Sequence, residues 1–399
     1  MKKTTVSAVG CSLADYLYTN LDFSSKAFAK YKSQRDGDGG LSPGHLVFTE
    51  NLEKFSGVSY SQITADLGCP NEPNAFNVGG PAIVAMINAA QLEQKNETEF
   101  KFFGALGKDQ TAERIYNILR QTPINTDNYI QVDGMSPFSD CLSDPKFHDG
   151  KGERLFVNNI GAAGKYTPEM LGEGFFDSDI LFFGATALVP HIHDNLGQLL
   201  KKGRAQGRVN VVSTVFDFRN EMANPGQPWP LGDGDESFAM IDLLVMDWDE
   251  TMKISGQNNI EDAFAFFIER GIGSLVVTHG AKNTYAWSSG KLFKKLDFTF
   301  LPVCALVDEE LAARPELRGD TTGCGDNFAG GILASLVENL NTCPRGELDL
   351  LEACSWAAAS GGFACFYVGG VYLEKHPGEK RERVKRYHDA YRKQIGLDR

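Results

Sequence analysis

Short apolar runs recur along the chain and alternate with longer segments whose apolar positions follow helical spacing. The apolar runs occupy Thr5–Val9, Phe100–Phe103, Ile180–Phe183, Val209–Val212, Leu243–Val245 and Leu275–Thr278. The helical segments occupy Ala82–Glu93, Thr111–Arg120, Ile192–Gln206, Ile260–Arg270 and Asn327–Asn339. Strands that alternate with crossover helices are typical of βαβ units. The pattern predicts an α/β fold with a doubly wound, mostly parallel sheet and sites at the carboxyl ends of its strands.

Two stretches do not follow this alternation of apolar strands and helical segments. Residues 16–75 are rich in Ser, Gly, Asp and Asn, and residues 131–164 alternate like antiparallel strands, as in Arg154-Leu-Phe-Val-Asn. Connections of this length in a compact domain are usually lids or binding loops. We therefore expect a single domain over residues 1–399 with insertions at about 16–75 and 131–164. A shorter charged insertion, Asp308–Arg318, is expected to be exposed.

Composition narrows the choice of partner. The formal net charge is −13, and no long basic run occurs among the 399 residues. Because nucleic-acid affinity depends on Lys and Arg that neutralise phosphates, we expect a small-molecule partner and no nucleic acid. The eight cysteines are scattered without metal-ligand spacing and are expected to be reduced thiols of a cytoplasmic protein. No apolar run approaches a membrane span, so no membrane partner is expected.

The segment Arg318–Gly331 carries the clearest chemical signal. Glycines at 323 and 325 permit a turn whose N–H groups converge on an anion at the start of a helix. The backbone N–H groups of Gly323, Cys324 and Gly325 are expected to stabilise charge on a transferred phosphoryl group. Asp326, in the first helical turn, is placed to take a proton from an attacking hydroxyl. A structural alternative makes Asp326 an ordinary carboxylate favoured by the helix dipole.

The same residues carry a family resemblance. Asp320-Thr-Thr-Gly-Cys-Gly-Asp326 resembles the D-T-x-G-A-G-D signature of the ribokinase-like, or PfkB, carbohydrate kinases, with Cys324 in place of the usual Ala. Further similar motifs follow the family's order along almost the whole chain: Val9-Gly10 with Asp15, Gly79-Gly80, Gly104–Asp109, Asp247–Glu250 and Thr278–Gly280. The resemblance implies a ribokinase-like fold with a small β-sheet lid formed by the two insertions. It also implies ATP and Mg²⁺ as cofactors, adds K⁺ as a further candidate, and leaves open a homodimer formed through the lid.

By resemblance, Asp15, Gly79 and Gly80 are the substrate-binding residues. A carboxylate after the first strand can accept hydrogen bonds from two adjacent sugar hydroxyls, and a buried acceptor rejects substrates that lack them. The two glycines permit close approach of the backbone to the substrate. A turn cap at Asp15 and a simple strand-to-helix turn at 79–80 are the structural alternatives. Val84 stands where the family often has Asn, which weakens any assignment to a common sugar.

The nucleotide and metal residues also come from the resemblance. Asp247, Thr278, Gly280 and Asp320 match positions that approach the nucleotide phosphates, and Asp320 also matches one near a monovalent-cation site. Glu250 is the metal candidate, because Mg²⁺ usually reaches protein through one or two carboxylates and waters. Asp249 and Glu250 in a first helical turn, and Asp320 as a turn residue, are the structural alternatives.

We therefore expect an ATP-dependent kinase that phosphorylates a hydroxyl of a small sugar or sugar-like molecule. A nucleoside kinase of the same fold is the nearest alternative. A non-catalytic PfkB-like binding or regulatory protein is the other, because Val84 and Asp247 depart from the family pattern.

Overall fold

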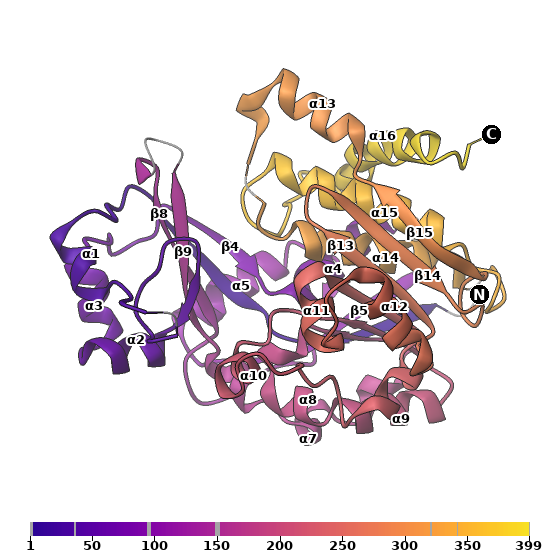
Figure 1. The fold of residues 1–399 in the computed structure, drawn as a ribbon, viewed down its shortest axis with the longest axis horizontal. Helices are drawn as coiled ribbons and strands as arrows, with labels where there is room; N and C mark the ends of the chain where they lie inside the picture. The colour runs from indigo at the N-terminus through magenta and orange to yellow at the C-terminus, as the bar shows by residue number, and fades with distance from the viewer. Residues whose placement is uncertain are drawn as a thin grey trace.

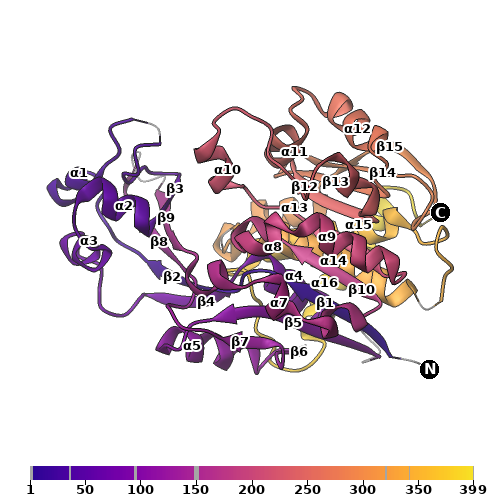
Figure 2. The same cartoon turned by 90° about the horizontal axis from the view of Figure 1, so that it is seen from below.

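The computed structural model describes residues 3–35, 37–93, 97–147, 152–319, 321–340 and 342–398. Figures 1 and 2 show a large lobe and a small lobe, with both chain ends on the side of the large lobe that faces away from the small one. Among the described residues, no helix is long and apolar enough to cross a membrane.

A long sheet forms the centre of the large lobe. Its strand order is β15-β14-β13-β12-β11-β10-β1-β5-β6, and β7 also pairs with β5. Pairs from β12–β13 through to β5–β6 are parallel, whereas β13–β14 and β14–β15 are antiparallel. The strands are β1 (Thr4–Val9), β5 (Thr98–Leu106), β6 (Ile124–Asn125), β7 (Tyr129–Gln131), β10 (Ile180–Gly184), β11 (Val209–Ser213), β12 (Leu243–Asp247), β13 (Ser274–His279), β14 (Asn283–Ser288) and β15 (Leu296–Pro302). All six predicted strands are therefore confirmed.

Both faces of the central parallel strands are buried, as their continuous apolar sequences require. Val6 and Ala8 belong to one hydrophobic cluster, and Val9 belongs to the cluster on the opposite face. The first face is covered by α4 (Pro81–Leu92), α14 (Cys324–Leu340), α15 (Leu350–Phe363) and α16 (Glu379–Gln394), and the second by α9 (Leu196–Ala205), α11 (Trp248–Ser255) and α12 (Ile260–Glu269). The predicted doubly wound sheet is confirmed.

The small lobe contains a second sheet with the order β3-β9-β8-β2-β4. Its strands are β2 (Leu13–Tyr18), β3 (Leu46–Phe48), β4 (Ala75–Gly79), β8 (Phe138–Asp144) and β9 (Glu153–Asn159). Leu142, Leu155 and Val157 share one face of it and pack against the helices α1 (Lys26–Tyr31), α2 (Thr49–Ser56) and α3 (Tyr60–Asp66). The antiparallel pair expected within 131–164 is β8 with β9. The helices within 16–75 were not predicted.

Helix boundaries differ from expectation at two places. The segment predicted as Ile192–Gln206 is interrupted at Asn195, so α8 (Pro190–Asp194) and α9 are separate helices. Helix α14 begins at Cys324, earlier than the predicted Asn327, and this start places Asp326 in the first turn. The charged insertion forms most of α13 (Ala305–Ala313), which is largely exposed but buries Leu311.

Candidate active site

The predicted anion-binding turn lies directly before α14. Gly323 has a φ of 76°, and a Cβ built there would lie 2.6 Å from Cα of Gly370, so only glycine fits. The N–H of Asn327 donates to the carbonyl oxygen of Gly323 at 2.8 Å, whereas the N–H of Cys324 makes a longer 3.3 Å contact with the carbonyl oxygen of Thr321. The first N–H groups of a helix have no preceding turn to bond, so this end of α14 can accept an anion.

Asp326 projects from this first turn and is half-buried. Burial raises the pKa of its carboxyl group to about 7. The charge of Asp326 also contributes to the raised pKa of Glu250, so the two side chains share one electrostatic environment. A carboxyl group that ionises near neutral pH at the start of α14 can act as a general base.

Asp247 and Glu250 form the N-terminal cap of α11. The Asp247 carboxylate accepts from the Glu250 N–H at 2.8 Å, and the Glu250 carboxylate accepts from the Asp247 N–H at 3.1 Å. The Thr214 hydroxyl donates to the same Glu250 oxygen at 2.6 Å. Burial, followed by the charge of Asp247, raises the pKa of Glu250 to about 8. The structural alternative, in which these residues lie in the capped first turn of a helix, is therefore observed. The same cap holds two acidic side chains close together, in the electrostatic environment of Asp326.

Asp15 lies against Gly79, and Gly80 follows directly in the chain. Asp15 in β2 pairs in register with Asn77 in β4, and a Cβ added at Gly79 would clash with the Asp15 carboxylate. Gly80 has a φ of 103°, and a Cβ there would clash with the carbonyl oxygen of Cys11. These contacts require glycine at both positions.

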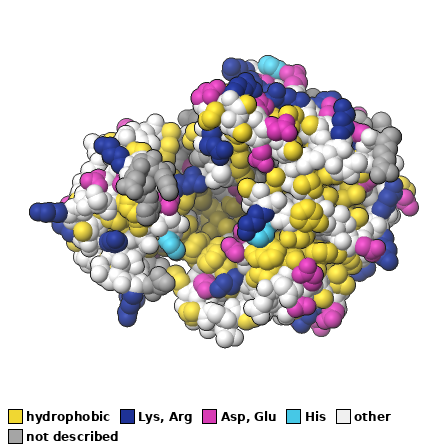
Figure 3. Space-filling view, turned by 45° about the horizontal axis from the view of Figure 1, so that its top comes forward, with side chains coloured by type: hydrophobic (Ala, Val, Ile, Leu, Met, Phe, Trp, Pro, Cys, Tyr) yellow, Lys and Arg dark blue, Asp and Glu magenta, His cyan; other side chains and the backbone are white. Residues whose placement is uncertain are grey.

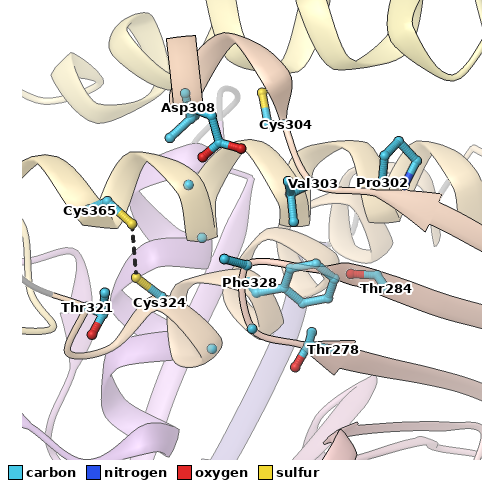
Figure 4. A pocket seen from close by; sticks show the side chains of 17 residues that line it. Thr278, Thr284, Pro302, Val303, Cys304, Asp308, Thr321, Cys324, Phe328 and Cys365 are labelled. Carbon is cyan, nitrogen blue, oxygen red and sulfur yellow. Dashed lines mark hydrogen bonds between the residues drawn. The ribbon is translucent and has the colours of Figure 1, made fainter. Parts of the chain in front are cut away.

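Thr278 and Gly280 line a cavity of about 320 Å³ beside the start of α14, shown in Figure 4. The cavity lies between the turn after β13, the start of α13, and the helices α14 and α15. Its lining is mostly apolar and includes Val303, Val307 and Phe328. An enclosure of this size next to an anion-binding helix end suits a flat apolar group attached to phosphates.

Asp320 lies outside the described residues. Its neighbours show where the signature loop is anchored: the N–H of Gly319 donates to the carbonyl oxygen of Cys365 at 2.8 Å. Arg154, from β9 of the small lobe, donates to the hydroxyls of Thr321 at 3.1 Å and Thr322 at 3.4 Å. The small lobe thus touches the signature loop directly.

A row of polar side chains on the inner face of the small sheet was not predicted from the sequence. Asp15 pairs in register with Ser139 of β8, and Ser139 pairs with Asn158 of β9. Neighbours in register share a sheet face, and this face also presents Asn77, which donates to the carbonyl oxygen of Val368 in the large lobe. The Oδ1 atom of Asn158 is buried and has no hydrogen-bond partner among the residues that the structure describes. The period-2 alternation of β9 was the only sequence signal for this row.

Lys380 was not predicted from the sequence as a residue near the site. It is buried in the first turn of α16, and its Nζ donates to Oδ1 of Asn327 at 2.7 Å. Asn327 Nδ2 donates in turn to the carbonyl oxygens of Gly323 and Gly370, at 2.8 Å and 2.9 Å. Burial lowers the pKa of Lys380 to about 7. No motif marks this residue, since its partner lies 53 positions away in the chain.

A hollow separates the two lobes, and Figure 3 shows hydrophobic side chains on its floor. A cavity of about 500 Å³ between the lobes is lined by Phe48 of the small lobe and by Leu188, Phe216 and Phe218 of the large one. The rings of Phe48 and Phe218 meet edge to face with centroids 5.6 Å apart. The lobes are therefore already in contact beside the hollow.

Comparison with known proteins agrees with this fold. Residues 55–376 match the pfkB family carbohydrate kinases. The chain superposes on ribokinase from Giardia lamblia with a TM-score of 0.63, at 16% identity over 96% of this chain and 99% of that one. Adenosine kinase from Schistosoma mansoni gives 0.66, at 13% identity over 94% and 98% of the two chains.

A segment of 116 residues is 31% identical to 2-dehydro-3-deoxygluconokinase from Thermoproteus tenax. This segment spans 29% of the present chain and 30% of that relative's length. The structural likenesses, at low identity, show the ribokinase-like fold, while the family match extends over most of the sequence. The chain belongs to the pfkB family of carbohydrate kinases.

Proposed function

We propose that this protein transfers the γ-phosphoryl group of ATP to a hydroxyl of a small sugar or sugar-like molecule, with Asp326 as the general base. The observation that carries the proposal is the position of Asp326. It projects from the anion-binding end of α14, and burial brings the pKa of its carboxyl group to about 7. Phosphoryl transfer needs alignment, charge stabilisation and a partner for the proton of the hydroxyl, and this location supplies all three.

The nucleotide occupies the 320 Å³ cavity in this proposal. Its base packs among the apolar residues near Phe328, and its phosphates pass Thr278 and Gly280 toward α14. The N–H groups of Gly323, Cys324 and Gly325 then face the transferred phosphoryl group. Asp320 remains a predicted phosphate neighbour, and K⁺ near it remains a prediction, as does a homodimer through the small lobe.

The acidic pair at the start of α11 fits a bound magnesium ion. Asp247 and Glu250 are crowded, and the pKa values of both are raised chiefly by burial. A nearby divalent cation would relieve this cost, and carboxylates that act through water suit Mg²⁺. In the proposed complex, Glu250 holds the water shell of the ion and Asp247 lies beside the phosphates. The bound ion would offset charge on the phosphates during transfer.

The acceptor lies between the lobes in this proposal. Asp15 accepts from two of its hydroxyls, Gly79 and Gly80 let the backbone approach it, and Ser139 and Asn158 extend the polar row. The small lobe then acts as a lid, since Arg154 already reaches the signature loop. Water excluded by this lid cannot compete with the acceptor for the phosphoryl group.

A nucleoside acceptor is the second candidate, and the 500 Å³ cavity favours it. Phe48, Phe216 and Phe218 line this cavity and offer apolar surface to a ring larger than a simple sugar. A sugar acid or a free sugar would leave this surface unused.

A panel of acceptors separates these possibilities. ADP release from MgATP would be measured with ribose, fructose, 2-dehydro-3-deoxygluconate, sugar phosphates and adenosine, using Asp326→Asn protein as the blank. Turnover with one sugar class and no turnover with adenosine supports the first proposal. Turnover with adenosine alone supports the second. ATP binding without turnover on any acceptor contradicts both and indicates a binding protein.

A further inference from the structure

Two thiols from distant parts of the chain meet beside the signature loop. Sγ of Cys324, the first residue of α14, lies 3.5 Å from Sγ of Cys365, as the dashed line in Figure 4 shows. Cys365 belongs to the short 3-10 turn Ala364–Phe366 that follows α15. Both residues are half-buried and both line the 320 Å³ cavity. A small oxidant that enters this cavity therefore reaches the two sulfur atoms together.

We propose that Cys324 and Cys365 are an oxidation site at which a hydroperoxide forms a disulfide that stops phosphoryl transfer. One thiolate attacks a peroxide oxygen, the O–O bond breaks, and a sulfenic acid and water (or an alcohol) form. The second thiol attacks the sulfenic sulfur, the S–S bond forms, and water leaves. The thiols lose two electrons to the peroxide, and their two protons leave in the products. A dithiol such as dithiothreitol reverses the change by exchange.

Formation of the bond draws together the two segments that lie beside the proposed base. An S–S bond of about 2.05 Å requires the sulfur atoms to approach by about 1.5 Å from their present separation. Little space is available on the α15 side, because a Cβ built at Gly361 would already lie 3.0 Å from the carbonyl oxygen of Cys324. The carbonyl oxygen of Cys365 also accepts from the N–H of Gly319, at the other end of the signature. The disulfide therefore pulls on both ends of the loop.

Where the backbone follows the sulfur atoms, even part of this displacement is large for catalysis. Misplacement of reacting groups by about 1 Å can cost about a hundredfold in rate. Asp326 lies two residues after Cys324 in the same helical turn, so a shift of the Cys324 backbone also shifts the base. The loss of turnover rests on the proposed function, whereas the formation of the disulfide does not.

Mass spectrometry tests the chemistry by itself. The protein would be treated with hydrogen peroxide, alkylated and digested with trypsin, which gives the peptides 319–345 and 346–375. The first peptide also contains Cys343 and the second also contains Cys354. Cys343→Ala protein leaves Cys324 as the single cysteine of the first peptide. Fragmentation of the linked peptides then shows whether its partner is Cys365 or the buried Cys354. We expect the mass of the protein to fall by 2 Da, the mass of two hydrogen atoms. We also expect a disulfide between Cys324 and Cys365 that dithiothreitol reduces. Absence of that link overturns the proposal.

Turnover tests the consequence. MgATP turnover would be measured before and after peroxide with ribose, 2-dehydro-3-deoxygluconate or adenosine, whichever reacts fastest, and each protein is normalised to its own reduced form. Wild-type and Cys343→Ala proteins should lose activity at least about tenfold and recover it with dithiothreitol. Cys365→Ala should keep more than half. Equal loss in Cys365→Ala, or full activity in the linked protein, contradicts the proposal.

Failure of the proposed function gives a different result. If the reduced protein turns over none of the three acceptors, binding of the ATP analogue AMP-PNP is measured by calorimetry in reduced and linked protein. If the disulfide weakens AMP-PNP binding at least about tenfold, it alters the nucleotide-binding loop even in a protein that shows no kinase activity. Equal binding in both forms overturns that effect.

Discussion

A carboxyl group can remove a proton from a sugar hydroxyl only while it is ionised, and burial raises the pKa of Asp326 to about 7. In wild-type protein, kcat/KM should therefore rise with pH up to about 7 and then level off. Asp326→Asn should lower kcat at least about 100-fold with little change in acceptor binding. Initial rates from pH 5.5 to 9 check both effects, with Asp389→Asn in α16 as a control. Near-normal turnover in Asp326→Asn would remove this residue from the mechanism.

Glu250 has two roles that one substitution can separate. It caps α11 through a side-chain oxygen, and we propose that its charge holds the water shell of magnesium. Glu250→Gln keeps an oxygen for the cap but loses the charge. We expect a higher magnesium concentration at half-maximal rate, a smaller change in acceptor KM, and an unchanged melting temperature. An unaltered magnesium dependence would show that Glu250 acts only as a cap.

Lys380 should make stability depend on pH. Burial lowers its pKa in the folded state to about 7, while the unfolded value is about 10.4. Between these values the unfolded chain binds a proton that the folded chain lacks, so this contribution to stability rises with pH, by at most about 1.4 kcal/mol per pH unit. Lys380→Met should remove the rise. Urea unfolding at pH 7.5, 8.5 and 9.5 measures it, and parallel pH dependences for the two proteins would contradict it.

The difference between Asp326 and Lys380 shows what a sequence can reveal about a site. Asp326 stands in a short motif whose glycines and helix start are local, so its position could be predicted. Lys380 reaches Asn327 only because α16 folds back onto α14. Glu250 lies between these cases: the resemblance gave it as the metal candidate, but its raised pKa depends on burial in the folded chain.

At the scale of elements, three strands of the small lobe build the proposed acceptor site. Asp15, Ser139 and Asn158 lie side by side on one face of β2, β8 and β9. Asn159, the next residue in β9, instead donates to the hydroxyl of Thr49. The two asparagines therefore form a matched pair, one toward the hollow and one toward α2.

This arrangement predicts how substitutions change acceptor binding. Asp15→Ala should lower kcat/KM about ten- to a hundredfold, the scale of 1.5–3 kcal/mol for a hydrogen bond to a charge, mainly through KM. Asn158→Ala should raise KM by a smaller factor, and Asn159→Ala should leave it unchanged. Steady-state kinetics with the best acceptor measures all three. Unchanged kinetics in Asp15→Ala would mean that other residues hold the acceptor.

The six predicted strands of the large sheet are buried on both faces over most of their length and therefore read as continuous apolar runs. Strand β15 was not predicted, because most of its residues are exposed or only partly buried. Helices α1–α3 could not be predicted, because they are short and bury only a few side chains, such as Phe28, Leu52 and Ile63, against the small sheet. The break at Asn195 was missed for a related reason: the apolar spacing continues across it while the backbone changes direction.

At the scale of the whole molecule, the contact between the lobes should control whether the phosphoryl group reaches the acceptor or water. Phe48 of β3 packs edge to face on Phe218, which begins α10 (Phe218–Ala223), and such a pair is worth about 1 kcal/mol. Phe48→Ala should therefore shift the lobes toward an open form and raise the ratio of hydrolysed to transferred phosphate up to about fivefold. Free phosphate and phosphorylated acceptor, measured in one reaction, give this ratio. Val58→Ala, at an exposed position of the small lobe, is the control. If Phe48→Ala lowers both products equally, closure of the small lobe does not protect the transfer.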